Sequence, residues 1–464
     1  MQLAISVLDD FIFGHAPKPE ACGRGLCLGQ GTVIPEINFT LPSIELTESN
    51  WIEIRRQYQE MIEGICKRAV ELEVPGLLVE FETLPAMTTR PAWGREIVEI
   101  LSTSLRTYHE KFGLKNVLRF TPNNTRDFLS PARMRSGEHW ETMKGLFAAA
   151  AGAGADLLSI ESTGGKEVCD EALRFGDFRE TVFGLAVLAA RDMEFLWGHM
   201  VDVCCKTQIV PAGDTACAFG NTAMVLADQK FISKVFAAVV RVASVPRSLV
   251  AYRLGAVGPS KDCAYEGPYL KAIAGVPISM EGRSSACAHL SHVGNIAQAV
   301  CDCWSNESVQ FVRLLSAYAP VVSLEQLAYD CRLLNTASSH AHSDVVRMRE
   351  WLTESDAALD PQAWVLRPDV VLRIAAKIAE QRTPYEQTRA AAYWAIKELR
   401  DAVSTGALNL ITRERKWLDK LAATVDQLPD REEELMEEML ASPLASRFIP
   451  EEYGLNMVPM HGGT

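Results

Sequence analysis

Short apolar runs alternate with amphipathic helical segments along the first part of this 464-residue chain. We expect strands at 76–81, 116–120, 156–160, 207–210, 248–254 and 277–280. The spacing of apolar residues predicts helices at 50–74, 93–109, 138–151, 167–189, 217–242 and 284–304. Strands that alternate with helices in this way are typical of a parallel sheet covered by helices.

Six or more strand–helix units fit a closed barrel better than a doubly wound sheet, since no Gly-x-Gly-x-x-Gly motif follows the first strand. We therefore predict an α/β fold, a TIM-like (β/α)8 barrel with an additional C-terminal helical region. The barrel, with an N-terminal helical extension, is expected to occupy residues 1–342. Residues 343–464 are expected to form a helical appendage, because charged helical segments replace the strand signal there.

The chain is acidic and rich in apolar residues. It has 46 Lys and Arg against 59 Asp and Glu, a formal net charge of −13, and 48% of its residues are hydrophobic. This composition excludes disorder as the main state and disfavours binding to nucleic acid or to anionic lipid. The apolar N-terminus carries Asp9 and Asp10 in place of the basic residues of a signal peptide, so we expect a cytoplasmic protein with no membrane partner.

Twelve cysteines are too few for a disulfide scaffold in a chain of this length. The sequence contains no Cys-x-x-Cys pair, which argues against zinc ribbons and thioredoxin-like redox sites. A metal site, if present, must therefore be assembled from distant parts of the chain.

Three glycine-bearing segments, 156–167, 211–222 and 255–267, follow predicted strands and lead towards helices. In a parallel barrel, functional residues lie on the loops at the C-terminal ends of the strands, and neighbouring strands are only about 5 Å apart. One carboxylate and two thiols from these loops could therefore bind one zinc ion and leave a fourth position open. The alternative is that the cysteines pack as small buried residues and the carboxylate caps a loop.

The motifs in these segments resemble those of the methanol:corrinoid methyltransferase family. They read IESTGGKE at 160–167, DTACAFGNTAM at 214–224 and GPSKDCAYEG at 258–267, and the resemblance extends from near residue 1 to about residue 455. It implies a TIM barrel and one Zn²⁺ per chain, held by one Glu and two Cys. In this sequence those ligands are Glu161, Cys217 and Cys263, and Glu167 is the rival carboxylate.

The resemblance also implies a reaction. The family transfers the methyl group of methanol to the Co(I) corrinoid of a separate partner protein. Hydroxide is a poor leaving group, and zinc can withdraw charge from the methanol oxygen as a Lewis acid. We hypothesise a nearby proton donor, with Asp214, Lys166 and Tyr265 as candidates by sequence proximity. Their structural alternatives are a loop cap, a surface charge at a helix start and packing at the barrel mouth.

Two other functions are weighed against this one. The methyl donor could be a methylamine, a methoxylated aromatic compound or a thiol, although the His-x-Cys pair favoured by thiol-methylating zinc enzymes is absent from the sequence. A non-catalytic docking protein with structural zinc is less favoured, because structural sites use four clustered ligands. A complex with the corrinoid protein, a homo-oligomer or both are expected.

Overall fold

The computed structural model describes residues 2–40, 45–215, 217–282, 292–309 and 317–455. Its main sheet has eight strands in the order β7-β6-β5-β4-β3-β10-β9-β8, and all neighbouring pairs are parallel. A parallel bridge between Thr215 and Lys261 joins the two ends of this order. The predicted TIM-like barrel is therefore confirmed. The strands are β3 (Ile34–Thr40), β4 (Leu77–Glu82), β5 (Asn116–Thr121), β6 (Leu157–Ile160), β7 (Val210–Asp214), β8 (Ser260–Asp262), β9 (Ile278–Glu281) and β10 (Cys303–Val309).

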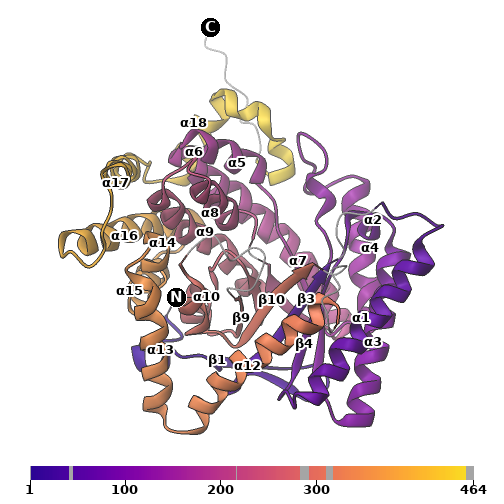
Figure 1. The fold of residues 1–464 in the computed structure, drawn as a ribbon. Coiled ribbons are helices and arrows are strands. Elements are labelled where there is room, and N and C mark those ends of the chain that lie inside the picture. The colour runs from indigo at the N-terminus through magenta and orange to yellow at the C-terminus, as the bar shows by residue number, and fades with distance from the viewer. Residues whose placement is uncertain (1, 41–44, 216, 283–291, 310–316, 456–464) are drawn as a thin grey trace.

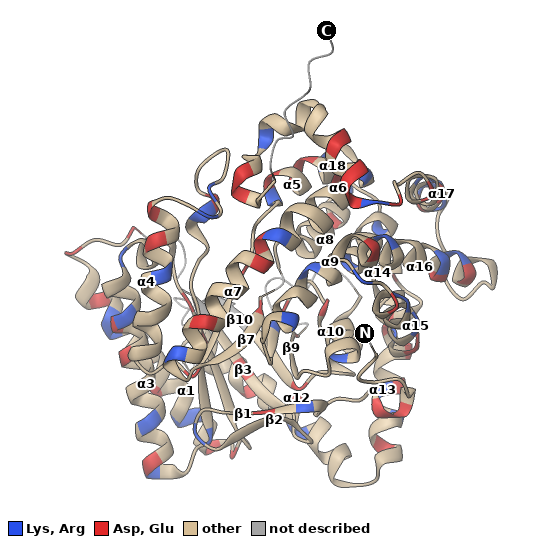
Figure 2. Ribbon diagram, turned by 180° about the vertical axis from the view of Figure 1, so that it is seen from behind, with Lys and Arg blue, Asp and Glu red and all other residues tan. Residues whose placement is uncertain are grey.

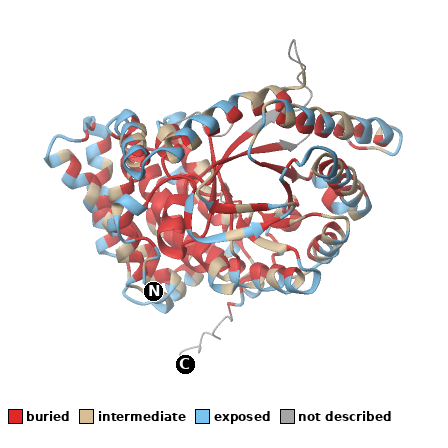
Figure 3. Cartoon of the chain, turned by 90° about the horizontal axis from the view of Figure 1, so that it is seen from below, coloured by how far each residue is buried: buried red, intermediate tan, exposed pale blue. Residues whose placement is uncertain are grey.

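Helices surround the barrel, and buried residues are concentrated between these helices and the strands (Figures 1 and 3). In β4, Leu77, Val79 and Phe81 belong to the core under the helices, whereas the buried Glu80 lies on the alternate face of the strand. The helices before residue 340 are α1 (Trp51–Glu71), α2 (Pro85–Thr89), α3 (Pro91–Phe112), α4 (Glu138–Gly152), α5 (Lys166–Phe175), α6 (Phe178–Phe183), α7 (Ala190–Thr207), α8 (Gly220–Asp228), α9 (Lys234–Leu254), α10 (Gly267–Ala274), α11 (Gly294–Gln298) and α12 (Ala319–Ser339).

An antiparallel hairpin closes the N-terminal end of the barrel. It consists of β1 (His15–Cys22) and β2 (Leu26–Gln30), and its apolar side chains pack with those of Leu78, Val117 and Leu157 at the starts of the strands. The segment before β3 therefore consists of a short 3-10 turn, Leu8–Asp10, and this hairpin, where a helical extension was expected. Helix α1 lies between β3 and β4 as part of the barrel wall.

Several predicted elements differ from the structure. The strand expected at 248–254 is the end of α9, a helix buried almost all round, so that its apolar residues give no one-sided helical pattern. The helix expected at 217–242 is divided between α8 and α9. Of the helix expected at 284–304, residues 284–291 lie outside the described part, and the rest contains α11 and the start of β10.

The predicted C-terminal helical region is confirmed. It contains α13 (His342–Ala357), α14 (Pro361–Trp364), α15 (Pro368–Ala379), α16 (Pro384–Ser404), α17 (Thr412–Asp426) and α18 (Glu432–Ala441), followed by the 3-10 turns η5 (Pro443–Arg447) and η6 (Pro450–Tyr453). These helices pack on α9, α10 and α6 and share one continuous apolar core with the barrel. The domain boundary at residue 342 stays a prediction.

Charged residues of both signs are mixed along the outer helices (Figure 2). Among the described residues, α9 alone is long and apolar enough to cross a membrane, and 94% of its most apolar window is buried inside the protein. It has the character of a core helix.

Candidate functional site

The three segments that carry the predicted ligands lie side by side at the C-terminal end of the barrel. The amide of Thr215 donates to the carbonyl of Ile160 at 2.9 Å, which aligns the ends of β6 and β7. Thr215 is also bridged to Lys261 of β8. Glu161 directly follows Ile160. Cys217 lies two residues after Thr215, and Cys263 lies two residues after Lys261.

Cys217 and Cys263 meet at this end of the barrel. The structure joins them as a disulfide, with their Cα atoms 5.5 Å apart. Within the described ranges, no group of three or more His, Cys, Asp or Glu side chains is arranged to hold a metal. The two sulfur atoms nevertheless lie next to each other on neighbouring loops. As free thiolates, both could bind the same metal ion, one that prefers soft ligands.

The carboxylate of Glu161 provides a test of whether the site suits a cation. The side chain is half-buried, and no described side chain makes a hydrogen bond or an ion pair with its carboxylate. Burial raises the pKa of Glu161 to about 7, although the positive charge of Lys166 opposes the rise. A half-buried carboxylate without a partner gains from a bound cation. Together with two thiols, it makes a donor set that fits Zn²⁺.

The main chain of Glu161 is held from the neighbouring strand. The side-chain amide of Asn124, which follows β5, donates to the carbonyl of Glu161 at 3.0 Å. Arg126 donates to the amide oxygen of Asn124 at 3.0 Å and makes a buried bidentate ion pair with Asp192 of α7, at 2.7 and 2.9 Å. This chain of contacts connects Glu161 to the helix layer outside the barrel.

Arg247 of α9 connects the loops of all three predicted ligands. It is buried and donates to Asp214 at 2.9 Å and to Ser162 at 2.7 Å. Its second guanidinium nitrogen lies 3.8 Å from Glu266, which also accepts a hydrogen bond from Ser244 at 2.5 Å. Arg247 therefore holds the ends of β6 and β7 and the loop after β8 in one arrangement.

The three candidate proton donors have different surroundings. Asp214 accepts hydrogen bonds from Ser162 as well as from Arg247, and burial raises its pKa. Lys166, at the start of α5, is partly exposed and ion-paired with Asp170 at 2.7 Å. Tyr265 is buried, with φ of 62°, and its hydroxyl donates to the carbonyl of Glu281 at 3.4 Å. Their role as donors stays a prediction.

The rival carboxylate, Glu167, has a partner that Glu161 lacks. Its Oε1 accepts a hydrogen bond from the hydroxyl of Tyr453 at 2.7 Å, and burial raises its pKa to about 7. The same hydroxyl accepts a hydrogen bond from the main-chain amide of Gly165 at 2.9 Å. Glu167 is thus engaged by the C-terminal segment.

Four residues that hold the site were not singled out from the sequence: Asn124, Arg126, Arg247 and Tyr453. Arg247 did carry a signal, because it interrupts an apolar run that is otherwise typical of a buried segment, and buried arginines are paired. The others gave none, because each acts on a segment far away in the sequence.

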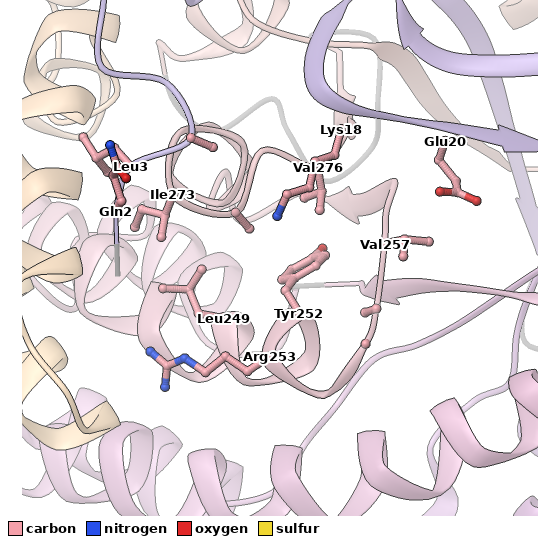
Figure 4. Close-up of a pocket in the computed structure, with 14 residues that line it drawn as sticks. Gln2, Leu3, Lys18, Glu20, Leu249, Tyr252, Arg253, Val257, Ile273 and Val276 are labelled. Atoms are coloured by element: carbon pink, nitrogen blue, oxygen red, sulfur yellow. The ribbon is translucent and has the colours of Figure 1, made fainter.

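A cavity of about 660 Å³ lies at the other end of the barrel (Figure 4). Its lining includes Val257 and Val276, which precede β8 and β9, together with Lys18 of β1 and Tyr252 of α9. It contains none of the three predicted metal ligands. The candidate site is therefore the cluster at the C-terminal ends of β6, β7 and β8.

Comparison with known proteins gives consistent matches along the whole chain. The sequence profile of a family described as methanol-cobalamin methyltransferase B subunit matches residues 1–454. The methanol–corrinoid protein co-methyltransferase of Methanosarcina barkeri is 35% identical over 458 residues, which are 97% of this chain and 98% of the relative. The crystal structure of the methanol:cobalamin methyltransferase complex from Methanosarcina barkeri matches with a TM-score of 0.92 at 33% identity, covering 98% of this chain and 99% of the matched chain.

Proposed function

Because this chain belongs to the methanol-cobalamin methyltransferase B subunit family, we propose that it transfers the methyl group of methanol to the corrinoid of a partner protein. The resemblance inferred from the three motifs is confirmed. In the reaction, the C–O bond of methanol breaks and the electron pair of Co(I) forms the Co–CH₃ bond. The hydroxide that leaves takes up one proton and becomes water.

The observation that carries the proposal is the meeting of Cys217 and Cys263 at the barrel mouth, beside the end of β6, which Glu161 directly follows. We propose that these three residues hold one Zn²⁺ per chain in the dithiol form. When bound, zinc supplies a Lewis acid that stabilises negative charge on the methanol oxygen. The thiolates and the carboxylate together carry three negative charges, which suits a dication in a partly buried position.

The surrounding residues position these ligands and supply a proton. Arg247 and Asn124 hold the loops, so that the ligands do not have to be ordered when the metal binds. Asp214 has its carboxylate engaged by Arg247 and Ser162, which favours a positioning role for it. Of the candidate proton donors, this leaves Lys166 and Tyr265 as the better ones, and Lys166 is partly exposed and paired with Asp170.

The partner is a corrinoid protein, which must bring its cobalt to the C-terminal end of the barrel. We propose that the reaction takes place in the cytoplasm, since the net charge of −13 disfavours contact with anionic lipid and α9 is buried inside the protein. A homo-oligomer also remains part of the proposal.

The test is methanol-dependent methylation of cob(I)alamin and of the corrinoid protein, followed anaerobically by absorbance. We expect turnover by the zinc-loaded protein and a loss of turnover after zinc removal and in Cys263→Ala. Turnover with a methylamine or a methoxylated aromatic compound but not with methanol would overturn the choice of substrate. Full activity of the zinc-free protein would overturn the proposed metal site.

A further inference from the structure

The last described residues of the chain lie against the loops that carry the candidate site. Glu452 accepts hydrogen bonds from the main-chain amide of Arg135, at 2.5 Å, and from the hydroxyl of Ser136, both on the segment that follows β5. Arg447 is ion-paired with Glu171 of α5 at 2.7 Å. α18 lies close to α5 and α6 (Figure 1).

Tyr453 makes the most direct of these contacts. The residue is fully buried, and its ring packs edge-on against Phe448 with ring centroids 6.0 Å apart. Its hydroxyl accepts from the amide of Gly165 at 2.9 Å and donates to Oε1 of Glu167 at 2.7 Å. A phenol hydroxyl has one proton to donate, so the donor and an acceptor position are both in use.

The loop held by this hydroxyl runs directly from Glu161 to α5 and has little room to move. Gly165 has φ of +80°, and a Cβ atom there would lie 2.6 Å from the carbonyl oxygen of Gly184. At Gly164 a Cβ atom would lie 2.2 Å from Cβ of Asp192. The loop is therefore pressed against the helix layer on one side and bonded to Tyr453 at its C-terminal end.

We propose that Tyr453 is a positioning residue of the metal site: by bonding Gly165 and Glu167, it holds the loop that presents Glu161 to the ion. This inference rests on the proposed zinc site. It assigns a role in metal binding to the C-terminal segment, 292 residues after the ligand in the sequence (453 − 161 = 292). The loop is thereby held at both ends, since Asn124 bonds the carbonyl of Glu161 and Tyr453 bonds the amide of Gly165.

Removing the hydroxyl would leave two groups without this partner, the buried amide of Gly165 and Oε1 of the half-buried Glu167. Such groups recover hydrogen bonds by shifting towards water or other partners. A shift of the loop by a fraction of an ångström alters the donor geometry at Glu161 without removing a ligand. Changes in the groups that orient metal ligands typically weaken metal binding by about 10- to 100-fold.

The experiment compares Tyr453→Phe with the wild-type chain by zinc competition against a chromogenic chelator. The visible spectrum of the Co²⁺-substituted protein reports the ligand geometry independently of activity. We expect a 10- to 100-fold weaker affinity for zinc and a changed cobalt spectrum in the variant. Tyr385→Phe is the matched control, because that hydroxyl is also buried near the C-terminal helices but donates to the carbonyl of Pro429, at 2.7 Å.

A second variant, Glu167→Ala, removes the acceptor of the same hydroxyl and covers the case in which Tyr453→Phe does not fold. We expect this variant to weaken zinc binding as well. The loss of binding free energy in the double variant should be smaller than the sum of the two single losses. Unchanged affinity and an unchanged cobalt spectrum in both folded variants would overturn the inference. If the wild-type chain itself bound no zinc, the proposed metal site would fail first, and the inference with it.

Discussion

The side-chain amide of Asn124 donates a hydrogen bond to the main-chain carbonyl of Glu161 across 3.0 Å. Asn124 follows β5 and Glu161 follows β6, so the contact joins the C-terminal ends of two neighbouring strands. It orients the main chain of Glu161 while leaving the carboxylate free of described partners. A ligand is thus held through its backbone, and its side chain stays available for a cation.

Asn124→Ala is expected to weaken zinc binding by roughly 10-fold or more, because the carbonyl of Glu161 and the guanidinium of Arg126 both lose a partner. Competition with a chelator measures the effect. Asn335→Ala is the control, since its amide also bridges main-chain groups, those of Val33, but far from the site. Equal affinity of the two variants would argue against a role for Asn124.

Cys217→Ala and Cys263→Ala are each expected to abolish stoichiometric zinc and methanol-dependent turnover, because two protein donors cannot replace three. Cys303→Ala is the control: that thiol is buried at the N-terminal end of the barrel, with the residues that pack on the hairpin. Metal analysis of the purified proteins gives the zinc content. Normal zinc in Cys263→Ala would remove it from the ligand set.

Glu161→Gln and Glu167→Gln distinguish the two carboxylates. We expect Glu161→Gln to lose zinc, because an amide neither carries the charge nor binds zinc as strongly as a carboxylate. Glu167→Gln keeps an oxygen that can accept from Tyr453, so its zinc content should be close to that of the wild type. The opposite result would make Glu167 the ligand.

Arg126→Met is expected to lower the free energy of unfolding by about 3–5 kcal/mol, since it leaves Asp192 buried and unpaired. Urea unfolding followed by circular dichroism measures the change. Arg56→Met removes an exposed ion pair with Glu53 on α1 and should leave the unfolding midpoint almost unchanged. Equal midpoints in the two variants would show that the buried pair adds nothing to stability.

Glu167 should make the stability of the zinc-free protein depend on pH. Burial raises its pKa from 4.5 to about 7, so the folded state keeps a proton that the unfolded state has lost. The contribution of this group to the free energy of unfolding therefore falls as pH rises between about 4.5 and 7. Glu167→Gln lacks this contribution, and its stability relative to the wild type should increase across that window. Thermal unfolding at several pH values measures the difference, and a constant difference would contradict the shift.

The strand–helix alternation was readable from the sequence wherever a strand carried an apolar run, as in 76–81 and 156–160. β3 and β8 were missed for a physical reason: Glu36, Asn38 and Lys261 lie buried in these strands and are not apolar. In β3, Glu36 is paired with Arg119 of β5 at 2.9 Å. A polar strand has no apolar run to reveal it, since the partners that compensate its charges come from other strands.

The sequence by itself indicated the kind of barrel, because strand–helix alternation is a local pattern, and the resemblance of its motifs to one family pointed to the three residues proposed to bind zinc. Only the tertiary structure decided which groups hold those residues in place. Asn124, Arg247 and Tyr453 each act on a segment that is remote in the chain and adjacent in space. Such contacts depend on how strands and helices pack, and neither spacing nor composition records that packing.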